Sequence, residues 1–333
     1  MGEDLPFADN QPDYGAEFAV LSMKTQISIV TVTHNSASCI RDCVASIQAQ
    51  TGIGAEVIVV DNASSDNTLQ VLAGLGSSVE VIANGENIGF GRACNQGVAA
   101  SQGELLFLLN PDAKLEQTDG LARACSSLLE HPRWGLAGTH VLSSDGLTDN
   151  PPATSYPEQN RANCSFSHLP GHLAWVLGAS MLIRREAFEA VGGFDPGFFL
   201  SSEETDLCLR MRQQGWEIGY VADVDVLHVG MASERGYDPY DTSLRRMEGM
   251  LRFWSKHYPP EVVQRLALRD LFRTRFRMGW YFIMSRFSAP SSNAMRKYRR
   301  YRGISEASRR FLHTGPRDHK LYIRPESEAS LEP

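Results

Sequence analysis

Apolar and polar residues alternate along residues 25–115 in a regular succession of short strands and amphipathic helices. Runs of β-branched or other apolar residues predict strands, and apolar residues at helical spacing predict the helices between them. The predicted strands cover residues 27–33, 56–64, 79–84 and 105–112, and the predicted helices cover 38–50, 67–75 and 91–102. Strands that alternate with helices form right-handed crossovers, so this part predicts a Rossmann-like half of an α/β fold with a mostly parallel sheet flanked by helices.

The pattern loosens from Gly135 onward. Residues 143–170 are rich in Ser, Pro and Asn and predict a long loop or lid. A strand and a helix follow in residues 177–194, an acidic helix start in 198–216, a last strand in 217–230, and basic helices from about Tyr240. We therefore divide the chain into a flexible tail (1–24), two halves of an α/β domain (25–135 and 136–235) and a basic helical C-terminal extension (236–333).

The composition is that of a globular protein with an uneven distribution of charge. A chain of 333 residues with 42% hydrophobic and 21% charged residues is not disordered as a whole. The net charge is −7, but residues 265–324 hold 16 of the 32 Lys and Arg and only three acids, which gives this segment about +13. A basic end on an acidic body favours an anionic partner, with nucleic acid and membrane lipid as the two candidates.

Cysteine usage and hydropathy bear on the cellular compartment. The six cysteines are scattered without CxxC spacing, which is typical of reduced thiols and not of a zinc site or a disulfide framework. The acidic N-terminal residues contain no apolar core of a secretion signal, and no run approaches the ~20 apolar residues that span a bilayer. We expect a cytoplasmic protein, or one held peripherally on the inner face of the plasma membrane.

Polar residues stand at the ends of two predicted strands. Asp61 and Asn62 end the second strand, and Asn110 and Asp112 flank Pro111 where the fourth strand stops. Asn, Pro and Asp are ordinary turn residues, which is one interpretation. The other is a cation site, because ligands of open α/β sheets bind outside the carboxyl ends of the strands and a carboxylate there can hold a divalent metal.

A glycine-rich segment, NGENIGFGRACNQG (84–97), lies between these strand ends. Its glycines allow close approach of a ligand, and the helix that follows offers an N-terminus that favours phosphate. The segment lacks the third glycine of GxGxxG, and the chain contains no GxxxxGK[ST] phosphate loop. The pattern indicates a nucleotide site of another design.

A second group of acids is Glu203, Glu204 and Asp206, in SSEETDLCLRMRQQGW. One interpretation is a helix start that Ser201 or Ser202 caps and that acids stabilise through the helix dipole. The other is a cleft in which mutual repulsion raises the pKa of one carboxyl toward that of a general base.

His228 closes the last predicted strand. A single histidine is more often structural than a ligand, but its position at a strand end also makes it a candidate metal contact beside Asp112.

Seven motifs in order resemble family 2 glycosyltransferases of GT-A fold, in the branch that includes bacterial rhamnosyltransferases. The motifs are ISIVTVTHNS, VIVVDNASSDNT, NIGFGRACNQG, LLFLLNPDA, GASMLIRREAFEAVGGFD, EETDLCLRMRQQGW and VLHVG, within residues 25–235. The resemblance implies an inverting transfer of a sugar, with rhamnose favoured, from a dTDP- or UDP-sugar to a lipid-linked or cell-surface glycan. It also implies Mg²⁺ or Mn²⁺ on the donor diphosphate, a nucleotide-sugar-binding first half (25–135) and an acceptor-binding, catalytic second half (136–235).

The resemblance assigns roles to individual residues. Asp61 would bind the base or ribose, with Thr33 and Asn35 near the uracil or thymine, and the pocket would be shaped by Asn87, Gly89 and Asn95. Asn110 and Asp112 stand where the family has its DxD motif, so the metal would rest on Asp112 with His228 as a helper. The family base aligns with Glu204, but Glu stands there in place of Asp, so Glu203 and Asp206 stay open as alternatives.

The basic C-terminal residues lie outside the resemblance. RFRMGWYFIMSRF (275–287) mixes aromatic residues with arginines, which is compatible with a solvated helix or with a membrane surface that carries a polyprenyl-diphosphate-linked acceptor. Nucleic acid is the poorer fit, and a homodimer stays open. The rival functions are a nucleotidyltransferase of similar fold and a non-catalytic nucleotide-binding scaffold.

Overall fold

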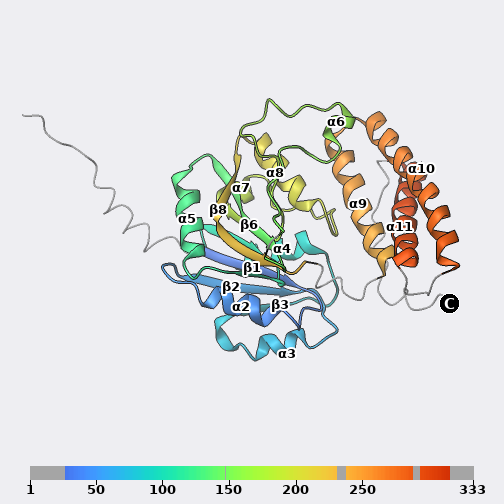
Figure 1. Ribbon diagram of the computed structural model, residues 1–333. Coiled ribbons are helices and arrows are strands. Elements are labelled where there is room, and N and C mark those ends of the chain that lie inside the picture. Colours follow the sequence, from blue (N-terminus) through green and yellow to red (C-terminus); the bar gives the residue numbers. More distant parts are fainter. Residues whose placement is uncertain (1–26, 147, 231–237, 288–292, 316–333) are drawn as a thin grey trace, which may run out of the picture.

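Eight strands form one mixed sheet in the computed structural model (Figure 1), which describes residues 27–146, 148–230, 238–287 and 293–315. The tail predicted at residues 1–24 lies outside the described residues. The strand order is β3-β2-β1-β4-β7-β6-β8-β5, with parallel pairing from β3 through to β4, between β6 and β8, and antiparallel pairing elsewhere. The strands are β1 (Ile27–Thr33), β2 (Ala55–Asp61), β3 (Glu80–Ala83), β4 (Leu105–Leu109), β5 (Ala113–Leu115), β6 (Trp134–Ser143), β7 (Ser180–Arg184) and β8 (Glu217–His228).

Alternation along the central strands separates the two faces of this sheet. In β1, Ile27 and Ile29 pack into the cluster under helices α2 (Ile40–Gln48), α3 (Thr68–Ala73) and α5 (Gly120–Glu130), whereas Val30 and Val32 pack into the opposite cluster. That second face is covered by α4 (Phe90–Ala100), α7 (Arg185–Ala190) and α8 (Glu203–Gln213). Burial on both faces explains why these strands are apolar throughout.

The elements predicted from residues 27–112 are confirmed within a few residues, but two later strands, β5 and β6, were missed. β6 was interpreted as a loosening of the pattern because Gly135 and Gly138 interrupt its apolar run. A Cβ at Gly138 would lie 2.7 Å from Val176 Cβ, so the strand uses glycine for close packing. The strand predicted in residues 177–194 is confirmed as β7, and its antiparallel pairing with β4 and β6 ends the continuous parallel part of the sheet after the first four strands, so the sheet as a whole is mixed.

Three long helices form a lobe beside the sheet domain (Figure 1): α9 (Pro239–His257), α10 (Pro260–Ser285) and α11 (Asn293–Thr314). Their shared core includes Trp254 and Phe311, and it extends to Phe198 and Leu209 of the sheet domain. The predicted helical C-terminal region is therefore confirmed, and it is packed onto the rest of the protein.

The segment 143–170 contains one short helix among its described residues, α6 (Gln159–Ala162). Tyr156 is 2% exposed and accepts a hydrogen bond from Arg212 Nη1 at 3.1 Å, and Arg212 Nε donates to the Pro170 carbonyl at 2.9 Å. The segment is thus the predicted long loop, but it is pinned to α8 and to the helical lobe, which does not support its interpretation as a lid.

Candidate active site

A cavity of about 260 Å³ opens at the carboxyl ends of β1, β2 and β4. Three parts of the chain build it: the strand ends, the loops 87–90 and 199–200, and the first turns of α9. Its lining is Val32, Thr33, His34, Asn62, Asn87, Gly89, Phe90, Asn110, Pro111, Asp112, Phe199, Leu200, His228, Asp241, Thr242, Arg245 and Arg246. The structure therefore brings together six of the residues predicted for the donor and metal sites: Thr33, Asn87, Gly89, Asn110, Asp112 and His228.

The predicted metal residues lie side by side because β5 pairs with β8. The register places Ala113 opposite His228, so Asp112 Oδ1 comes 3.2 Å from His228 Nε2, and Asn110 Nδ2 lies 3.4 Å from the same nitrogen. Two ligand atoms bound to one ion at about 2.1 Å each are themselves about 3 Å apart, so Asp112 and His228 fit a shared cation. Within the described residues no group of three or more His, Cys, Asp or Glu side chains could hold a metal, so such an ion would need further ligands from a substrate.

Asp61 and Asn35, which were predicted to lie near the nucleoside, make hydrogen bonds that connect the ends of β1 and β2 with the loop that follows β2. Asp61 is fully buried and accepts hydrogen bonds from Thr33 Oγ1 at 2.9 Å and from the Ser64 amide at 2.9 Å. Asn35, at a φ of 53°, accepts from the Ser65 amide at 2.8 Å. Neither Asp61 nor Asn35 lines the cavity, so their predicted contacts with the base stay a prediction.

The loop before α4 is shaped by Asn87 and Gly89. Asn87 Oδ1 accepts from the Gly89 amide at 3.0 Å, and Gly89 has a φ of 90°, which favours glycine. A Cβ at Gly89 would also lie 2.6 Å from the Phe199 carbonyl oxygen, which accepts from the Phe90 amide at 3.1 Å. This glycine therefore lets two cavity walls approach each other.

Glu203 and Glu204 begin α8 a few residues after Leu200, which lines the cavity. Burial, followed by the charge of Glu204, raises the pKa of Glu203 to about 8. Burial also raises the pKa of Glu204, and backbone N–H groups, including those of Ser202 and Thr205, oppose that rise. Glu203 is 5% exposed with no hydrogen-bond partner for Oε2, whereas Glu204 is only partly buried and packs against Gly178. Of the two side chains, Glu204 is therefore the more exposed, and neither lines the cavity.

The turn that presents these acids is strained. Ser201 and Ser202 have φ values of 74° and 73°, a left-handed conformation that costs about 1–2 kcal/mol for each non-glycine residue. Ser202 occupies the N-cap position of α8 without a side-chain capping bond, so of the helix-start interpretation the acidic first turn is confirmed and the serine cap is wrong. Backbone strain of this kind concentrates at functional sites, where the surrounding structure enforces it.

Two family models match the chain over most of its described length. The description "Glycosyl transferase family 2" matches residues 28–192, and "Glycosyl transferase family group 2" matches residues 119–292, more than half of the chain. The chain belongs to glycosyl transferase family 2. It is a glycosyltransferase, and its relatives support the rhamnosyltransferase-like branch.

Two relatives and one solved structure illustrate this similarity. The N-acetylglucosaminyl-diphospho-decaprenol L-rhamnosyltransferase of Mycobacterium tuberculosis is 28% identical over 255 residues, which cover 65% of this chain and 80% of the relative. The O-antigen chain rhamnosyltransferase WbaN of Salmonella anatum is 25% identical over 191 residues, 55% of this chain and 59% of the relative. The mannosyltransferase PcManGT of Pyrobaculum calidifontis, solved with GDP-Man and Mn²⁺, shares the fold at a TM-score of 0.54 and 18% identity, with 86% of each chain covered.

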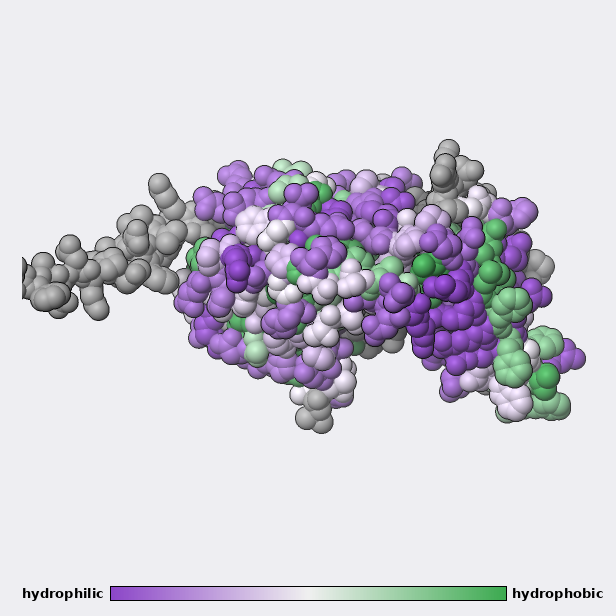
Figure 2. All heavy atoms as spheres, turned by 90° about the horizontal axis from the view of Figure 1, so that it is seen from above, coloured by the Kyte–Doolittle hydropathy of each residue, from purple (hydrophilic) through white to green (hydrophobic). Residues whose placement is uncertain are grey.

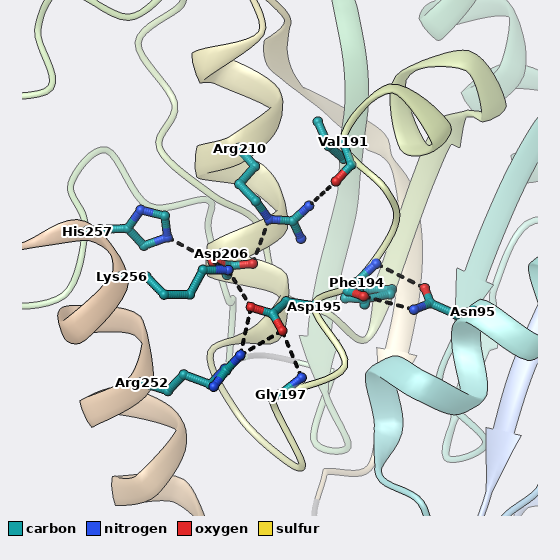
Figure 3. Close-up of polar contacts among 10 residues, drawn as sticks. All are labelled: Asn95, Val191, Phe194, Asp195, Gly197, Asp206, Arg210, Arg252, Lys256 and His257. Atoms are coloured by element: carbon teal, nitrogen blue, oxygen red, sulfur yellow. Dashed lines mark hydrogen bonds and ion pairs between the residues drawn. The ribbon is translucent and has the colours of Figure 1, made fainter. Parts of the chain in front are cut away.

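Two further predicted site residues of this glycosyltransferase, Asp206 and Asn95, have structural partners instead of a place in the cavity (Figure 3). Asp206 is fully buried, makes ion pairs with Arg210 Nε at 2.7 Å and Lys256 Nζ at 2.6 Å, and lies within hydrogen-bonding distance of His257 Nε2 at 2.8 Å. Although burial alone would raise the pKa of Asp206, its bond to His257 and the charges of Arg210 and Lys256 hold it well below its usual range. Asn95 uses both amide atoms on the Phe194 backbone, at 2.8 and 2.9 Å. Asp206 therefore ties α8 to α9, and Asn95 ties α4 to the loop before the acids.

Sequence reasoning missed the contribution of α9 to the glycosyltransferase site. Asp241, Thr242, Arg245 and Arg246 line the cavity, and the Arg245 guanidinium lies 4.5 Å from the centre of the Phe199 ring. Further along α9, Arg252 and Lys256 bind Asp195 at 2.9 and 2.6 Å (Figure 3). The sequence did contain a sign of this contribution, because Arg245, Arg252 and Lys256 are spaced so that they share one face of a helix. These residues were assigned only to the basic extension.

Proposed function

We propose that this glycosyltransferase transfers a sugar with inversion from a dTDP- or UDP-sugar to a lipid-linked or cell-surface glycan, with Glu204 as the general base. The observation that carries the proposal is the continuity of residues 199–204. Phe199 and Leu200 line the cavity at the strand ends, and Glu204 follows at the start of α8. A donor in that cavity and an acceptor at Glu204 would therefore meet across one short turn.

The carboxylate pair suits proton transfer at neutral pH. Because the pKa of Glu203 is raised to about 8, Glu203 holds a proton at pH 7 and leaves the negative charge to Glu204. Glu204 then accepts the proton of the acceptor hydroxyl while that oxygen attacks the anomeric carbon from the side opposite the leaving diphosphate. This direct displacement inverts the configuration of the anomeric carbon.

Arginine side chains and a bound divalent cation would both stabilise the negative charge of the leaving diphosphate. Arg245 and Arg246 line the same cavity as the strand ends, and guanidinium groups bind phosphate oxygens well. A Mg²⁺ or Mn²⁺ ion, when bound, would be held by Asp112 and His228 with Asn110 beside them, and would supply stabilisation of the diphosphate charge. PcManGT, which shares the fold, was solved with Mn²⁺, and this supports a divalent metal here.

Rhamnose is the proposed sugar because two relatives are named rhamnosyltransferases. The relative from Mycobacterium tuberculosis is named for an N-acetylglucosaminyl-diphospho-decaprenol acceptor, which supports a polyprenyl-diphosphate-linked acceptor here. Family membership favours this function over a nucleotidyltransferase, and the presence of both Glu203 and Glu204 favours an enzyme over a non-catalytic scaffold.

Replacement of Asp112 by alanine tests the donor and metal sites together. We expect Mn²⁺ to strengthen the binding of dTDP and UDP by wild-type protein, and Asp112→Ala to weaken it about 10–100-fold, to the level seen with EDTA. Isothermal titration calorimetry with each nucleotide measures this effect. The matched control is Asp119→Ala, an exposed carboxylate at the start of α5, which we expect to bind as wild type. Binding that neither EDTA nor Asp112→Ala changes would contradict a metal at this position.

We also propose that the enzyme works at the inner face of the plasma membrane as a peripheral protein. Within the described residues no helix is long and apolar enough to cross a membrane. One face of α10, however, exposes large apolar side chains at a spacing of three or four residues: Phe272 (69% exposed), Phe276 (81%), Trp280 (60%) and Ile283 (59%). Phe287 (86%) follows in the turn after the helix. Figure 2 shows hydrophobic side chains at the end of the molecule formed by the C-terminal helices, next to strongly hydrophilic surface. Aromatic residues bordered by arginines suit the interface of an anionic bilayer.

Serine at both Phe276 and Trp280 is expected to abolish flotation with liposomes that contain anionic lipid. Wild-type protein should float with these liposomes and less with neutral ones, because the arginines contribute an electrostatic attraction. Leu69→Ser, which changes an exposed apolar residue on α3, serves as the control and should float as wild type. If wild-type protein stayed at the bottom of the gradient in the presence of anionic liposomes, the membrane proposal would be wrong.

A further inference from the structure

A second cavity, of about 530 Å³, lies between α9, α10 and α11, away from the strand ends. Five arginines line it: Arg246, Arg269, Arg273, Arg277 and Arg300. None of the motifs that indicated the donor site falls in this region, and the proposed mechanism assigns it no role.

The positive charge of this cavity is only partly balanced. Its two acids, Glu158 and Asp270, both bind Arg269, at 2.7 and 2.8 Å. Arg277 donates to the neutral Tyr301 hydroxyl at 3.0 Å, which leaves its charge in place. Arg273 and Arg300 make no ion pair with any residue that the structure describes. The cavity therefore has an excess of positive charge on guanidinium groups, which bind phosphate oxygens in a bidentate manner.

The lining of the cavity also includes apolar side chains. They are Met247, Met250 and Trp254 of α9 and Ile304 of α11. An inorganic anion or a nucleic-acid backbone would gain little from these apolar side chains, whereas an anion attached to a hydrocarbon chain would contact both kinds of residue. The cavity thus matches an amphiphilic phosphate.

The cavity also lies between the donor site and the exposed apolar face of α10. Arg246 lines both cavities, so the two sites share one side chain of α9. On α10, Arg269, Arg273 and Arg277 face the second cavity at intervals of four residues, and Phe272, Phe276 and Trp280 occupy the neighbouring face. A ligand here would therefore lie between the donor site and the surface proposed to meet the bilayer.

We propose that this cavity binds the diphosphate of the polyprenyl-linked acceptor, with Arg273, Arg277 and Arg300 as the principal contacts. The proposal rests on the proposed function in one respect, because it takes the acceptor to be lipid-linked. The apolar side chains of the lining contact the first part of the hydrocarbon chain, and the sugar end of the acceptor extends past Arg246 toward Glu204. Arg273 and Arg300 are therefore residues that determine acceptor affinity.

The test is direct binding of farnesyl diphosphate, a soluble prenyl diphosphate, to full-length protein and to the double variant Arg273→Gln/Arg300→Gln. We expect the double variant to bind about 10–100-fold more weakly, because each lost guanidinium removes charge-assisted hydrogen bonds. The matched control is Arg275→Gln/Arg296→Gln, which removes two exposed arginines of the same helices that do not line the cavity. In a transfer assay the first pair should raise the KM for a lipid-linked acceptor and the control pair should not.

The other ligands separate the possible sources of the anion. Farnesol and inorganic diphosphate should each bind more weakly than farnesyl diphosphate, and liposomes with anionic headgroups should not compete with it. Equal binding of inorganic diphosphate, competition by the liposomes, or equal losses in both double variants would overturn the proposal. Binding of farnesyl diphosphate needs no turnover, so its loss in Arg273→Gln/Arg300→Gln would support this site even if the protein transferred no sugar. If wild type transferred sugar but the same double variant bound farnesyl diphosphate as wild type does, this site would be wrong and the proposed function would stand.

Discussion

Glu204→Gln is expected to lower the rate of sugar transfer by about 10³-fold and to leave nucleotide affinity within about twofold of wild type. The amide keeps the size of the side chain but cannot accept the acceptor proton. Glu204 is outside the cavity that is proposed to hold the nucleotide, so nucleotide affinity should survive. Steady-state transfer kinetics and calorimetry on the same preparation measure the two effects. A transfer rate close to that of wild type would place the base elsewhere.

Glu203→Gln is the matched control for the base, and it has its own pH signature. The pKa of Glu203 is raised to about 8, above its value in the unfolded chain, chiefly by burial and then by the charge of Glu204. The folded state therefore binds this proton more tightly, and the stability that this gives at low pH is lost as the pH rises through about 8. Glu203→Gln should remove this loss, so that its melting temperature falls less than that of wild type between pH 6 and pH 9. Its transfer rate should fall far less than that of Glu204→Gln.

Asp206→Asn is expected to reduce the free energy of unfolding by about 3–5 kcal/mol, because it removes the only carboxylate shared by Arg210, Lys256 and His257 among the described contacts. A change of this size corresponds to a fall in melting temperature of about 10 °C. The pKa of Asp206 is lowered in the folded state, so wild-type stability from this group is present at neutral pH and is lost in acid. This loss occurs only below the pKa of an unfolded aspartate, about 4, so thermal unfolding followed by circular dichroism at pH 7 and pH 2.5 should show a smaller difference between variant and wild type at pH 2.5.

Asp119→Asn provides the comparison for Asp206. Asp119 has an exposed side chain and one exposed ion pair with Arg123, so its removal should cost less than about 1 kcal/mol. If Asp206→Asn unfolded as wild type but lost sugar transfer, Asp206 would belong to the catalytic machinery and its assignment as an ion-pair anchor would be wrong.

The edge of the sheet at which the cavity lies could be predicted from the sequence. Parallel strands place their carboxyl ends at one edge, so the polar residues after the strands at 27–33, 56–61 and 105–109 converge without any knowledge of distant contacts. The sequence also predicted that Asp112 and His228 lie close together, because both follow or end predicted strands. It did not predict the antiparallel pairing of β5 with β8 that brings them together.

The roles of the three acids could not be separated from the sequence. The partners of Asp206 on α9, Lys256 and His257, stand about fifty residues further along the chain, and only the packing of α9 against α8 reveals them. Arg245 and Arg246 were missed for the same reason, since a helix that returns to the strand ends does so through tertiary contacts. Asn95 was assigned to the pocket by resemblance, and its two bonds to Phe194 show that an amide next to a site can serve the backbone instead.

The most direct measurement is the anomeric configuration of the product formed from dTDP-rhamnose and a polyprenyl-diphosphate-linked N-acetylglucosamine, determined by NMR for wild type and Glu204→Gln. The proposed mechanism predicts that wild type forms a rhamnosyl product of configuration opposite to that of the donor, in a reaction that needs Mg²⁺ or Mn²⁺, and that Glu204→Gln forms almost none. A product with the configuration of the donor, or equal product from both proteins, would contradict direct displacement with Glu204 as the base.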